Sequence, residues 1–372
     1  MNLTIRTLIT LLIITSVTSA CVVAPKTVRM DVDKGAVANE ARKQRELAVK
    51  NYYLQFERLQ TVAWPVLKSN TNLCEDRTAP STGLFAENVY RYEDADMQQA
   101  ARDALGMDNN FRVLFVAPQS PAEHAGIVKG DIITKVNGKV IPATKEASEI
   151  IATIMKESAD ETVWNVEIEN SLGEMKQLSI NSVDICNYGV RLQESDTVNA
   201  FADGDNIILT QGMMRFTGSD KELGLVVGHE IAHNIMNHMS AKTTNYVLGS
   251  VLDVIAAAYG IDTQNAFGKM SANAYSQDFE AEADYVGIYL IAKSGYDIEG
   301  SADFWRRMAS IHPGNIATNH AASHPATPER FVAIEETIKE VTLKTANNEP
   351  LDFELKPHEK TEKAVTKKPF GS

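Results

Sequence analysis

Two histidines at helical spacing flank a glutamate in the segment His229-Glu230-Ile231-Ala232-His233. On an α-helix, residues i and i+4 lie one turn apart on the same face, so both histidines can direct a ring nitrogen at one zinc ion. Glu230 lies beside them, where it can activate a zinc-bound water whose pKa falls to about 7. The pattern predicts a hydrolytic zinc site. The alternative is a buried helix with two hydrogen-bonded histidines.

A catalytic zinc normally has three protein ligands and one open position, so a further ligand is needed. Six residues beyond the second histidine stands Met239, and His238 falls on a different side of a continued helix. Downstream, Glu280 and Asp284 share the i, i+4 spacing. We expect Glu280 to be the third ligand and Asp284 to fix a ligand imidazole, with Glu282 directed to solvent. The alternative is an ordinary acidic first turn of a helix.

Helices must carry these side chains. Ser219 and Glu222 form an S-x-x-E capping box, which predicts where the first helix begins. The helix of Glu280 is expected to run to Lys293, with Gly295 as its stop, and another helix follows Thr327. The region after residue 186 is therefore expected to be mainly helical.

The pair HEIAH and FEAEAD resembles the HtpX/BepA type of gluzincin, which belongs to the CAAX-prenyl-protease group. Two further stretches are similar: NAFADG at 199–204, with the strand that follows it, and SHPATPER at 323–330. The resemblance extends over about residues 186–344. It implies an endopeptidase domain with a small edge sheet, whose strand near residues 199–209 pairs with an extended substrate.

The resemblance also assigns the site. It implies that His229, His233 and Glu280 bind one Zn²⁺ and that Glu230 is the general base. His324 would lie close to the zinc, either stabilising the oxyanion of the tetrahedral intermediate or acting as a fourth ligand that keeps the enzyme latent. The alternative for His324 is a helix cap.

Other polar residues are assigned less specific roles. Arg330 is expected to hydrogen-bond Asp284 or the developing oxyanion, or to pair with a surface carboxylate. His238 and His320 are expected to be solvated or structural.

Ahead of this region, the string SPAEHAGIVKGDIITKVNG at 120–138 closely resembles the core of bacterial PDZ domains. A strand at 111–116, a helix near 145–157 and a hairpin at 163–180 fit the same fold. PDZ domains bind extended peptides by adding a strand to the edge of their sheet. The alternative is a small β-rich domain that only packs on its neighbour. The loop that would hold a peptide carboxylate is not identified by the sequence.

The first twenty residues are expected to be a signal peptide, because their apolar stretch, residues 8–17, is too short to span a bilayer, which needs about 20 residues. Thr18-Ser19-Ala20-Cys21 resembles a lipobox, in which Cys21 is acylated. The alternative is ordinary cleavage with Cys21 incidental. Val22 after the cysteine implies an outer-membrane lipoprotein that faces the periplasm of a Gram-negative bacterium.

Two cysteines remain, Cys74 and Cys186. An oxidising compartment favours one disulfide, worth roughly 4 to 5 kcal/mol for a loop of about 110 residues; the alternative is two buried thiols. The 372 residues suffice for two or three domains, and the net charge of −13 argues against a nucleic-acid partner.

The expected fold class is α+β, with a mainly helical gluzincin-like domain and a β-rich PDZ-like domain. The expected segments are a signal peptide (1–20), a lipid-anchored tether (21–35), an N-terminal helix packing on the catalytic domain (36–84), a PDZ-like domain (85–183), a metallopeptidase domain (184–346) and a disordered tail (347–372). The N-terminal helix is expected to end near Pro65. An apolar helix at 246–259 is expected to be buried or to cover the site, with a lid dipping toward lipid as the alternative.

These features predict a zinc-dependent endopeptidase that hydrolyses unfolded or misassembled envelope proteins. The expected partners are extended polypeptides, the membrane through the lipid anchor, and outer-membrane assembly machinery. The alternative is a peptide-binding or chaperone-like lipoprotein whose zinc site is latent.

Overall fold

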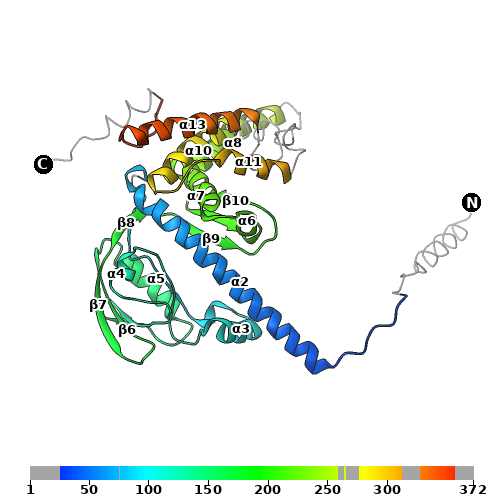
Figure 1. Cartoon of the computed structure of the whole chain (residues 1–372), viewed down its shortest axis with the longest axis vertical. Coiled ribbons are helices and arrows are strands. Elements are labelled where there is room, and N and C mark those ends of the chain that lie inside the picture. Colours follow the sequence, from blue (N-terminus) through cyan, green and yellow to red (C-terminus); the bar gives the residue numbers. More distant parts are fainter. Residues whose placement is uncertain (1–25, 75, 259–263, 265–275, 312–326, 357–372) are drawn as a thin grey trace, which may run out of the picture. The chain divides into compact units, whose positions relative to one another are not determined.

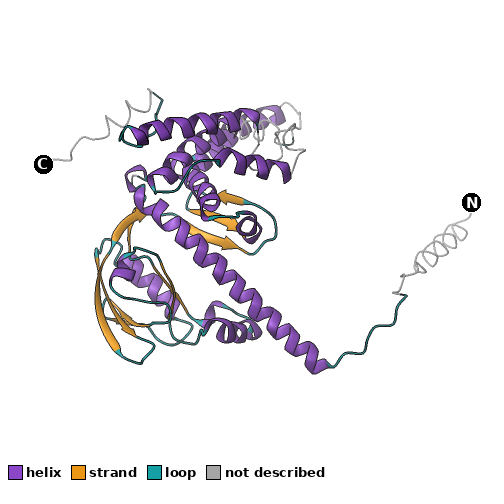
Figure 2. Cartoon of the chain, in the orientation of Figure 1, coloured by secondary structure: helices purple, strands orange, loops and turns teal. Residues whose placement is uncertain are grey.

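The structure of the protein is a computed structural model, which describes residues 26–74, 76–258, 264, 276–311 and 327–356. Strands lie between residues 78 and 210, and every described element after residue 210 is a helix (Figure 2). The predicted α+β class is confirmed. Among the described residues, no helix combines the length and the hydrophobicity needed to cross a membrane.

A six-stranded sheet forms the PDZ-like region. Its strands are β2 (Leu84–Glu87), β3 (Arg112–Val116), β4 (Ile132–Val136), β6 (Val163–Glu169) and β7 (Met175–Asn181), paired in that order, with β5 (Lys139–Val140) beside β4. Helices α3 (Ala95–Leu105), α4 (Pro121–His124) and α5 (Ala147–Glu157) connect them. Alternate strand residues such as Val113, Ile133 and Ile168 are buried and form one core with Ile154 of α5. The strand, helix and hairpin predicted from the sequence are all present.

Two smaller sheets follow. Strands β1 (Thr78–Ser81) and β8 (Val183–Cys186) pair antiparallel, next to the disulfide between Cys74 and Cys186, whose Cα atoms are 5.6 Å apart. The second sheet has the order β10 (Ala200–Ala202), β11 (Asn206–Thr210), β9 (Gly189–Gln193). Strand β10 is antiparallel to β11 and lies at the edge of this sheet, near α7.

The helical region consists of α6 (Gln211–Phe216), α7 (Asp220–Ile235), α8 (His238–Ala258), α10 (Ser276–Lys293), α11 (Ser301–Ile311) and α13 (Pro328–Ala346). Helix α10 packs between α7 and α13, as Figure 1 shows. The crossing of α7 and α10 is very close at two glycines. A Cβ on Gly228 would lie 2.5 Å from Ile291 Cγ2, and one on Gly287 would lie 3.1 Å from the backbone nitrogen of His229. Glycine therefore permits the two helices to approach.

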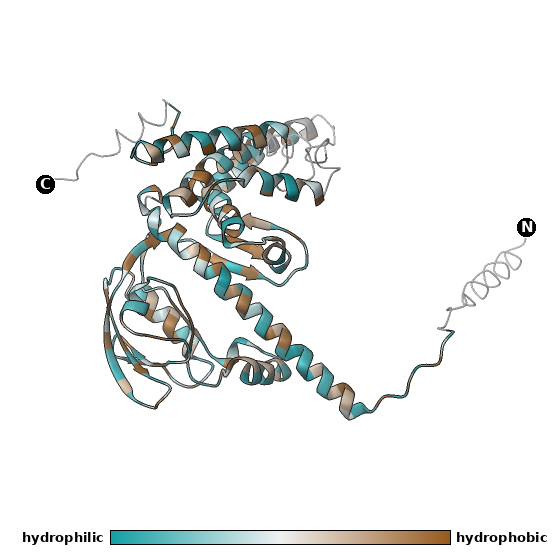
Figure 3. Ribbon diagram, viewed as in Figure 1, coloured by the Kyte–Doolittle hydropathy of each residue, from teal (hydrophilic) through white to brown (hydrophobic). Residues whose placement is uncertain are grey.

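Helix α2 (Lys34–Ser69) does not end near Pro65, so that prediction is wrong. Proline removes one helical hydrogen bond, but the residues around it, Trp64, Val66 and Leu67, are buried, and this packing maintains the helix. Apolar and polar residues are interleaved along α2 (Figure 3). Its second half is hydrogen-bonded to the helical region, for example from the Tyr296 hydroxyl to the Val62 carbonyl at 3.1 Å. Short 3-10 turns at Thr71–Leu73 and Val89–Arg91 follow.

Candidate metal centre

Helix α7 carries the HEIAH segment and begins where the capping box predicts. The Ser219 hydroxyl accepts a hydrogen bond from the Glu222 backbone N–H at 3.3 Å. The Glu222 carboxylate reaches back to Gly218 N–H at 2.7 Å, one residue earlier than the usual box, and Arg307 also binds it at 2.7 Å. The start of α7 is thereby fixed, and its residues from Leu223 to Asn234 are all buried.

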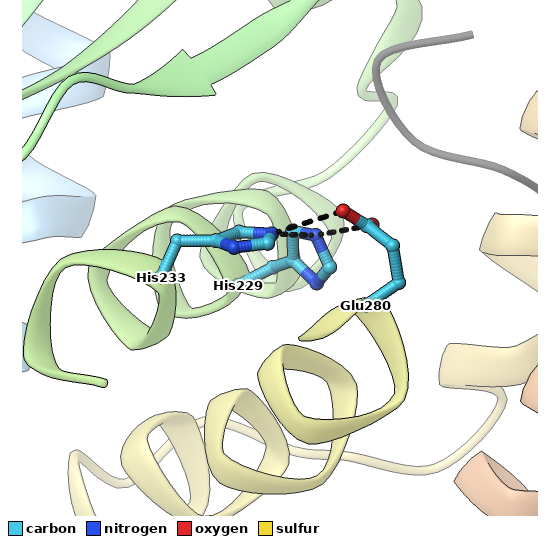
Figure 4. A group of neighbouring side chains, drawn as sticks. All are labelled: His229, His233 and Glu280. Carbon is cyan, nitrogen blue, oxygen red and sulfur yellow. Dashed lines mark hydrogen bonds and ion pairs between the residues drawn. The ribbon is translucent and has the colours of Figure 1, made fainter. Parts of the chain in front are cut away.

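His229, His233 and Glu280 converge from α7 and α10 (Figure 4). The two Nε2 atoms are 3.1 Å apart, and each lies 3.4 Å from an oxygen of Glu280. Zinc bonds of about 2.0 to 2.2 Å in tetrahedral geometry place neighbouring ligand atoms roughly 3.3 to 3.5 Å apart. The three side chains therefore have the spacing of ligands around one ion.

Charge gives a second test of whether a metal fits. The carboxylates of Glu230, Glu280 and Asp284 are all at most 4% exposed, and among the described residues the arginine buried beside them is Arg330, which is 5% exposed. Burying like charges together is costly unless opposite charge is present. With both imidazoles neutral, as metal ligation requires, a divalent cation would balance the two negative charges that Arg330 leaves, so the donor set suits such an ion.

Asp284 connects the ligand site to Arg330. Its Oδ1 lies 3.0 Å from His229 Nδ1, on the side of the ring away from Glu280, and Arg330 binds both Asp284 oxygens at 2.7 and 2.8 Å. Arg330 Nη1 also lies 3.3 Å from Glu280. Of the alternatives that the sequence leaves for Arg330, the structure has the contact with Asp284.

The pKa shifts follow from this packing. Burial raises the pKa of Asp284, but Arg330 and His229 outweigh burial and hold it below its usual range. Burial lowers the pKa of His229, yet its hydrogen bonds to Asp284 and Glu280 raise that pKa to about 10. For Arg330 too, burial is outweighed by the carboxylates, and its pKa is raised. The two carboxylates thus favour positive charge at the imidazole of His229.

Glu230 is 2% exposed and lies within the same helix turn as the two histidines. Next to them on α7, Asn234 forms hydrogen bonds with the β10–β11 hairpin. Its side-chain oxygen accepts a hydrogen bond from Gly204 N–H at 2.8 Å, and its amide donates to the Asn206 carbonyl at 3.1 Å. The β10–β11 hairpin is therefore held at a fixed position relative to the HEIAH segment.

His238 is a part of the site that sequence reasoning missed. It is only 1% exposed, and its Nδ1 lies 2.8 Å from Nδ1 of His233. Its Nε2 lies 2.9 Å from Glu282, whose side chain is 38% exposed, so Glu282 is partly solvated as expected and also contacts His238, which was not expected. The sequence contained one sign of this contact, a third histidine five residues after His233.

Other predicted residues lie outside the described residues: His324, His320, the lipidation candidate Cys21 and the signal peptide, together with the end of the tail. Within α8, apolar residues such as Leu248, Val251 and Val254 are more than half exposed, which differs from the expected buried helix.

Comparison with known proteins agrees with this geometry. Residues 174–338 match peptidase family M48, and residues 112–164 match a PDZ domain. The chain is 29% identical over 155 residues to a beta-barrel assembly-enhancing protease of Yersinia pestis, over 38% of this chain and 32% of that protein. It is 25% identical over 174 residues to the mitochondrial metalloendopeptidase OMA1 of Schizosaccharomyces pombe, over 45% and 51%.

A third relative is the metalloprotease YcaL of Escherichia coli, 28% identical over 168 residues, with 43% of this chain and 65% of that protein covered. The chain thus spans 32% to 65% of the length of these relatives. Together, fold, site and matches define a chain with a metallopeptidase domain and a PDZ domain. More narrowly, residues 174–338, which are fewer than half of the chain, are similar to peptidase family M48.

Proposed function

We propose that this protein is a zinc-dependent endopeptidase. The observation that carries the proposal is the convergence of His229, His233 and Glu280, all within 4.8 Å of one another, beside the buried carboxylate of Glu230. An ion held by three protein ligands retains an open position for chemistry. A protein that only binds peptides has no need of a carboxylate such as Glu230 at that position.

The roles of the side chains follow from their positions. Zinc, when bound, would supply a Lewis acid that polarises the scissile carbonyl and acidifies water. Glu230 takes the proton from the attacking water and passes it to the leaving amine. Asp284, whose Oδ1 lies 3.0 Å from His229 Nδ1, would favour a proton on that nitrogen and so keep Nε2 available as a ligand, while Arg330 neutralises the charge that Asp284 brings into the interior.

The substrate is proposed to be an extended polypeptide that pairs with β10. This strand is at the edge of its sheet and close to α7, and Asn234 fixes its hairpin next to His233. Edge strands present backbone donors and acceptors to an added strand. Selection of extended backbone favours unfolded segments as substrates.

Casein, which lacks stable structure, provides the test. Purified residues 22–372 with one equivalent of zinc should degrade casein, a phenanthroline chelator should stop cleavage, and added zinc should restore it. Zinc bound in full without cleavage of casein would instead favour the alternative, a peptide-binding protein with a latent site.

The PDZ domain is proposed to hold part of the same substrate. A groove of about 410 Å³ lies between the edge strand β2 and helix α5. Its apolar lining includes Leu84, Phe111, Ile151 and Trp164, and Ser148 of α5 donates to Glu87 of β2 at 2.9 Å. An edge strand beside an apolar groove is the arrangement in which a peptide adds a strand and inserts alternate side chains.

Ala152→Arg should block this groove, because Ala152 lines it and is exposed, so the helix tolerates the longer side chain. We expect the KM for casein to rise several-fold with kcat unchanged, since binding is lost and the metal site is untouched. Thr153→Arg, on the same helix but outside the groove, is the matched control. Equal KM values for both variants would contradict the role of the groove.

We further propose that the protein acts in the bacterial envelope, tethered by lipid at Cys21, on unfolded or misassembled envelope proteins, with outer-membrane assembly machinery as a partner. The lipobox-like sequence before Cys21 supports the anchor. The name of the Yersinia pestis relative, a beta-barrel assembly-enhancing protease, supports the setting. Cells fed labelled palmitate should incorporate the label into the wild-type protein and not into Cys21→Ser. Equal labelling of both proteins would contradict the lipid anchor.

A further inference from the structure

We propose that His238, itself oriented by Glu282, is a positioning residue for the metal ligand His233. The inference rests on the proposed function only in taking zinc as the ion. The nitrogen concerned is Nδ1 of His233, on the opposite side of the ring from the ligand atom Nε2. His238 on α8 and Glu282 on α10 would together orient this ring.

The contacts form a chain of three side chains. Glu282 Oε2 lies 2.9 Å from His238 Nε2, and His238 Nδ1 lies 2.8 Å from His233 Nδ1. The far nitrogen of His233, Nε2, is the atom 3.4 Å from Glu280. His233 and His238 are 4% and 1% exposed, so water does not readily replace either partner.

The donor and acceptor roles follow from the order of the chain. A carboxylate only accepts, so Glu282 assigns the proton of His238 to Nε2. Nδ1 of neutral His238 is then an acceptor, and it takes the N–H of His233 at Nδ1. His233 is thereby held in the tautomer whose Nε2 carries a lone pair toward the ion, which is the form that zinc requires.

Nδ1 of each histidine ligand thus has a close polar neighbour, but the two neighbours differ in kind. For His229 the neighbour is a carboxylate, Asp284, whose Oδ1 lies 3.0 Å away. For His233 the acceptor is a neutral ring, with the carboxylate of Glu282 one step further away. A further buried carboxylate in direct contact with the ligands would add negative charge to an interior that already holds Glu230, Glu280 and Asp284. The intervening histidine orients the ligand without that cost.

The ring of His238 is itself held by packing. It stacks on Phe279 with ring centroids 4.7 Å apart, and meets His233 edge-on at 4.9 Å. Phe279 directly precedes Glu280 on α10. The first residue of α8 therefore contacts both helices that supply the ligands, and its orientation is determined from two sides.

The experiment compares His238→Ala, His238→Asn and Glu282→Ala with wild type and with His124→Ala, an exposed histidine of the PDZ region. Zinc affinity is measured by competition with a chromophoric chelator, and the visible absorption spectrum of the Co²⁺-loaded protein reports ligand geometry. We expect His238→Ala to weaken zinc binding about 10- to 100-fold and to alter the Co²⁺ spectrum. Glu282→Ala should have a smaller effect in the same direction, and His124→Ala none.

His238→Asn distinguishes orientation from packing. The asparagine oxygen can occupy the place of Nδ1 and still accept from His233, although it cannot stack on Phe279 as an imidazole does. Affinity near wild type in His238→Asn, with loss in His238→Ala, is the expected result. Equal losses in both, or wild-type affinity in both, would overturn the proposal. Failure of the wild type itself to bind zinc would instead refute the proposed function.

Discussion

Glu230→Gln is expected to abolish the cleavage of casein while zinc remains bound. Glutamine is nearly isosteric with glutamate and leaves His229, His233 and Glu280 unchanged, so the ligand set is intact. It cannot take up a proton, and loss of a general base costs about 10²- to 10⁴-fold in rate. A time course of casein degradation, with metal content measured on the same samples, checks both parts of this expectation.

Glu336→Gln is the matched control, because Glu336 is 65% exposed on α13 and contacts only a lysine one turn away among the interactions described. Its rate should equal that of wild type. Cleavage by Glu230→Gln at an unchanged rate would mean that the base is elsewhere. If neither wild type nor variant cleaves although zinc is bound, His324→Ala is the informative change, since removal of an inhibitory fourth ligand would switch cleavage on.

Glu280→Gln should have the other large effect, the loss of the metal. The change removes the charged oxygen donors that lie 3.4 Å from both imidazole Nε2 atoms. It also removes negative charge that favours a cation in the site. Because loss of an outer hydrogen-bond partner alone weakens metal binding about 10- to 100-fold, loss of a direct ligand should exceed about 100-fold.

Metal analysis after dialysis measures this effect. Asp278→Asn, an exposed carboxylate two residues earlier on α10, should keep its zinc. Retention of one zinc per chain by Glu280→Gln, at wild-type affinity, would show that the third ligand is a different residue.

Much of this site could be predicted because it depends on local periodicity. Ser219 and Glu222 fix the start of α7, and i, i+4 spacing then places His229 with His233, and Glu280 with Asp284. The approach of the two helices to each other could not be derived from that periodicity. It depends on packing between residues distant in the sequence, such as Gly228 and Gly287.

His238 was missed for a specific reason. Extending α7 past His233 places position 238 on another side of the helix, but α7 ends at Ile235. Asn237 has φ of 55°, in the left-handed region that asparagine tolerates, and the chain turns there before α8 begins. The turn returns the His238 ring to Nδ1 of His233. At Pro65 the prediction was wrong in the opposite way. Proline was expected to end α2, but the helix continues to Ser69 because the neighbouring residues are buried.

The close crossing at Gly228 and Gly287 bears on how the metal is acquired. His229 follows Gly228 directly in the sequence. The backbone contact between α7 and α10 at Gly228 and Gly287 therefore determines the distance between the histidine ligands and Glu280. In small zinc domains, by contrast, the ion creates the fold and a chelator unfolds the chain. Here the ligand cage is preorganised by the hydrophobic core around it. We therefore expect a chelator to remove the metal without unfolding the chain, at the cost of the stability that the cation adds beside the buried carboxylates.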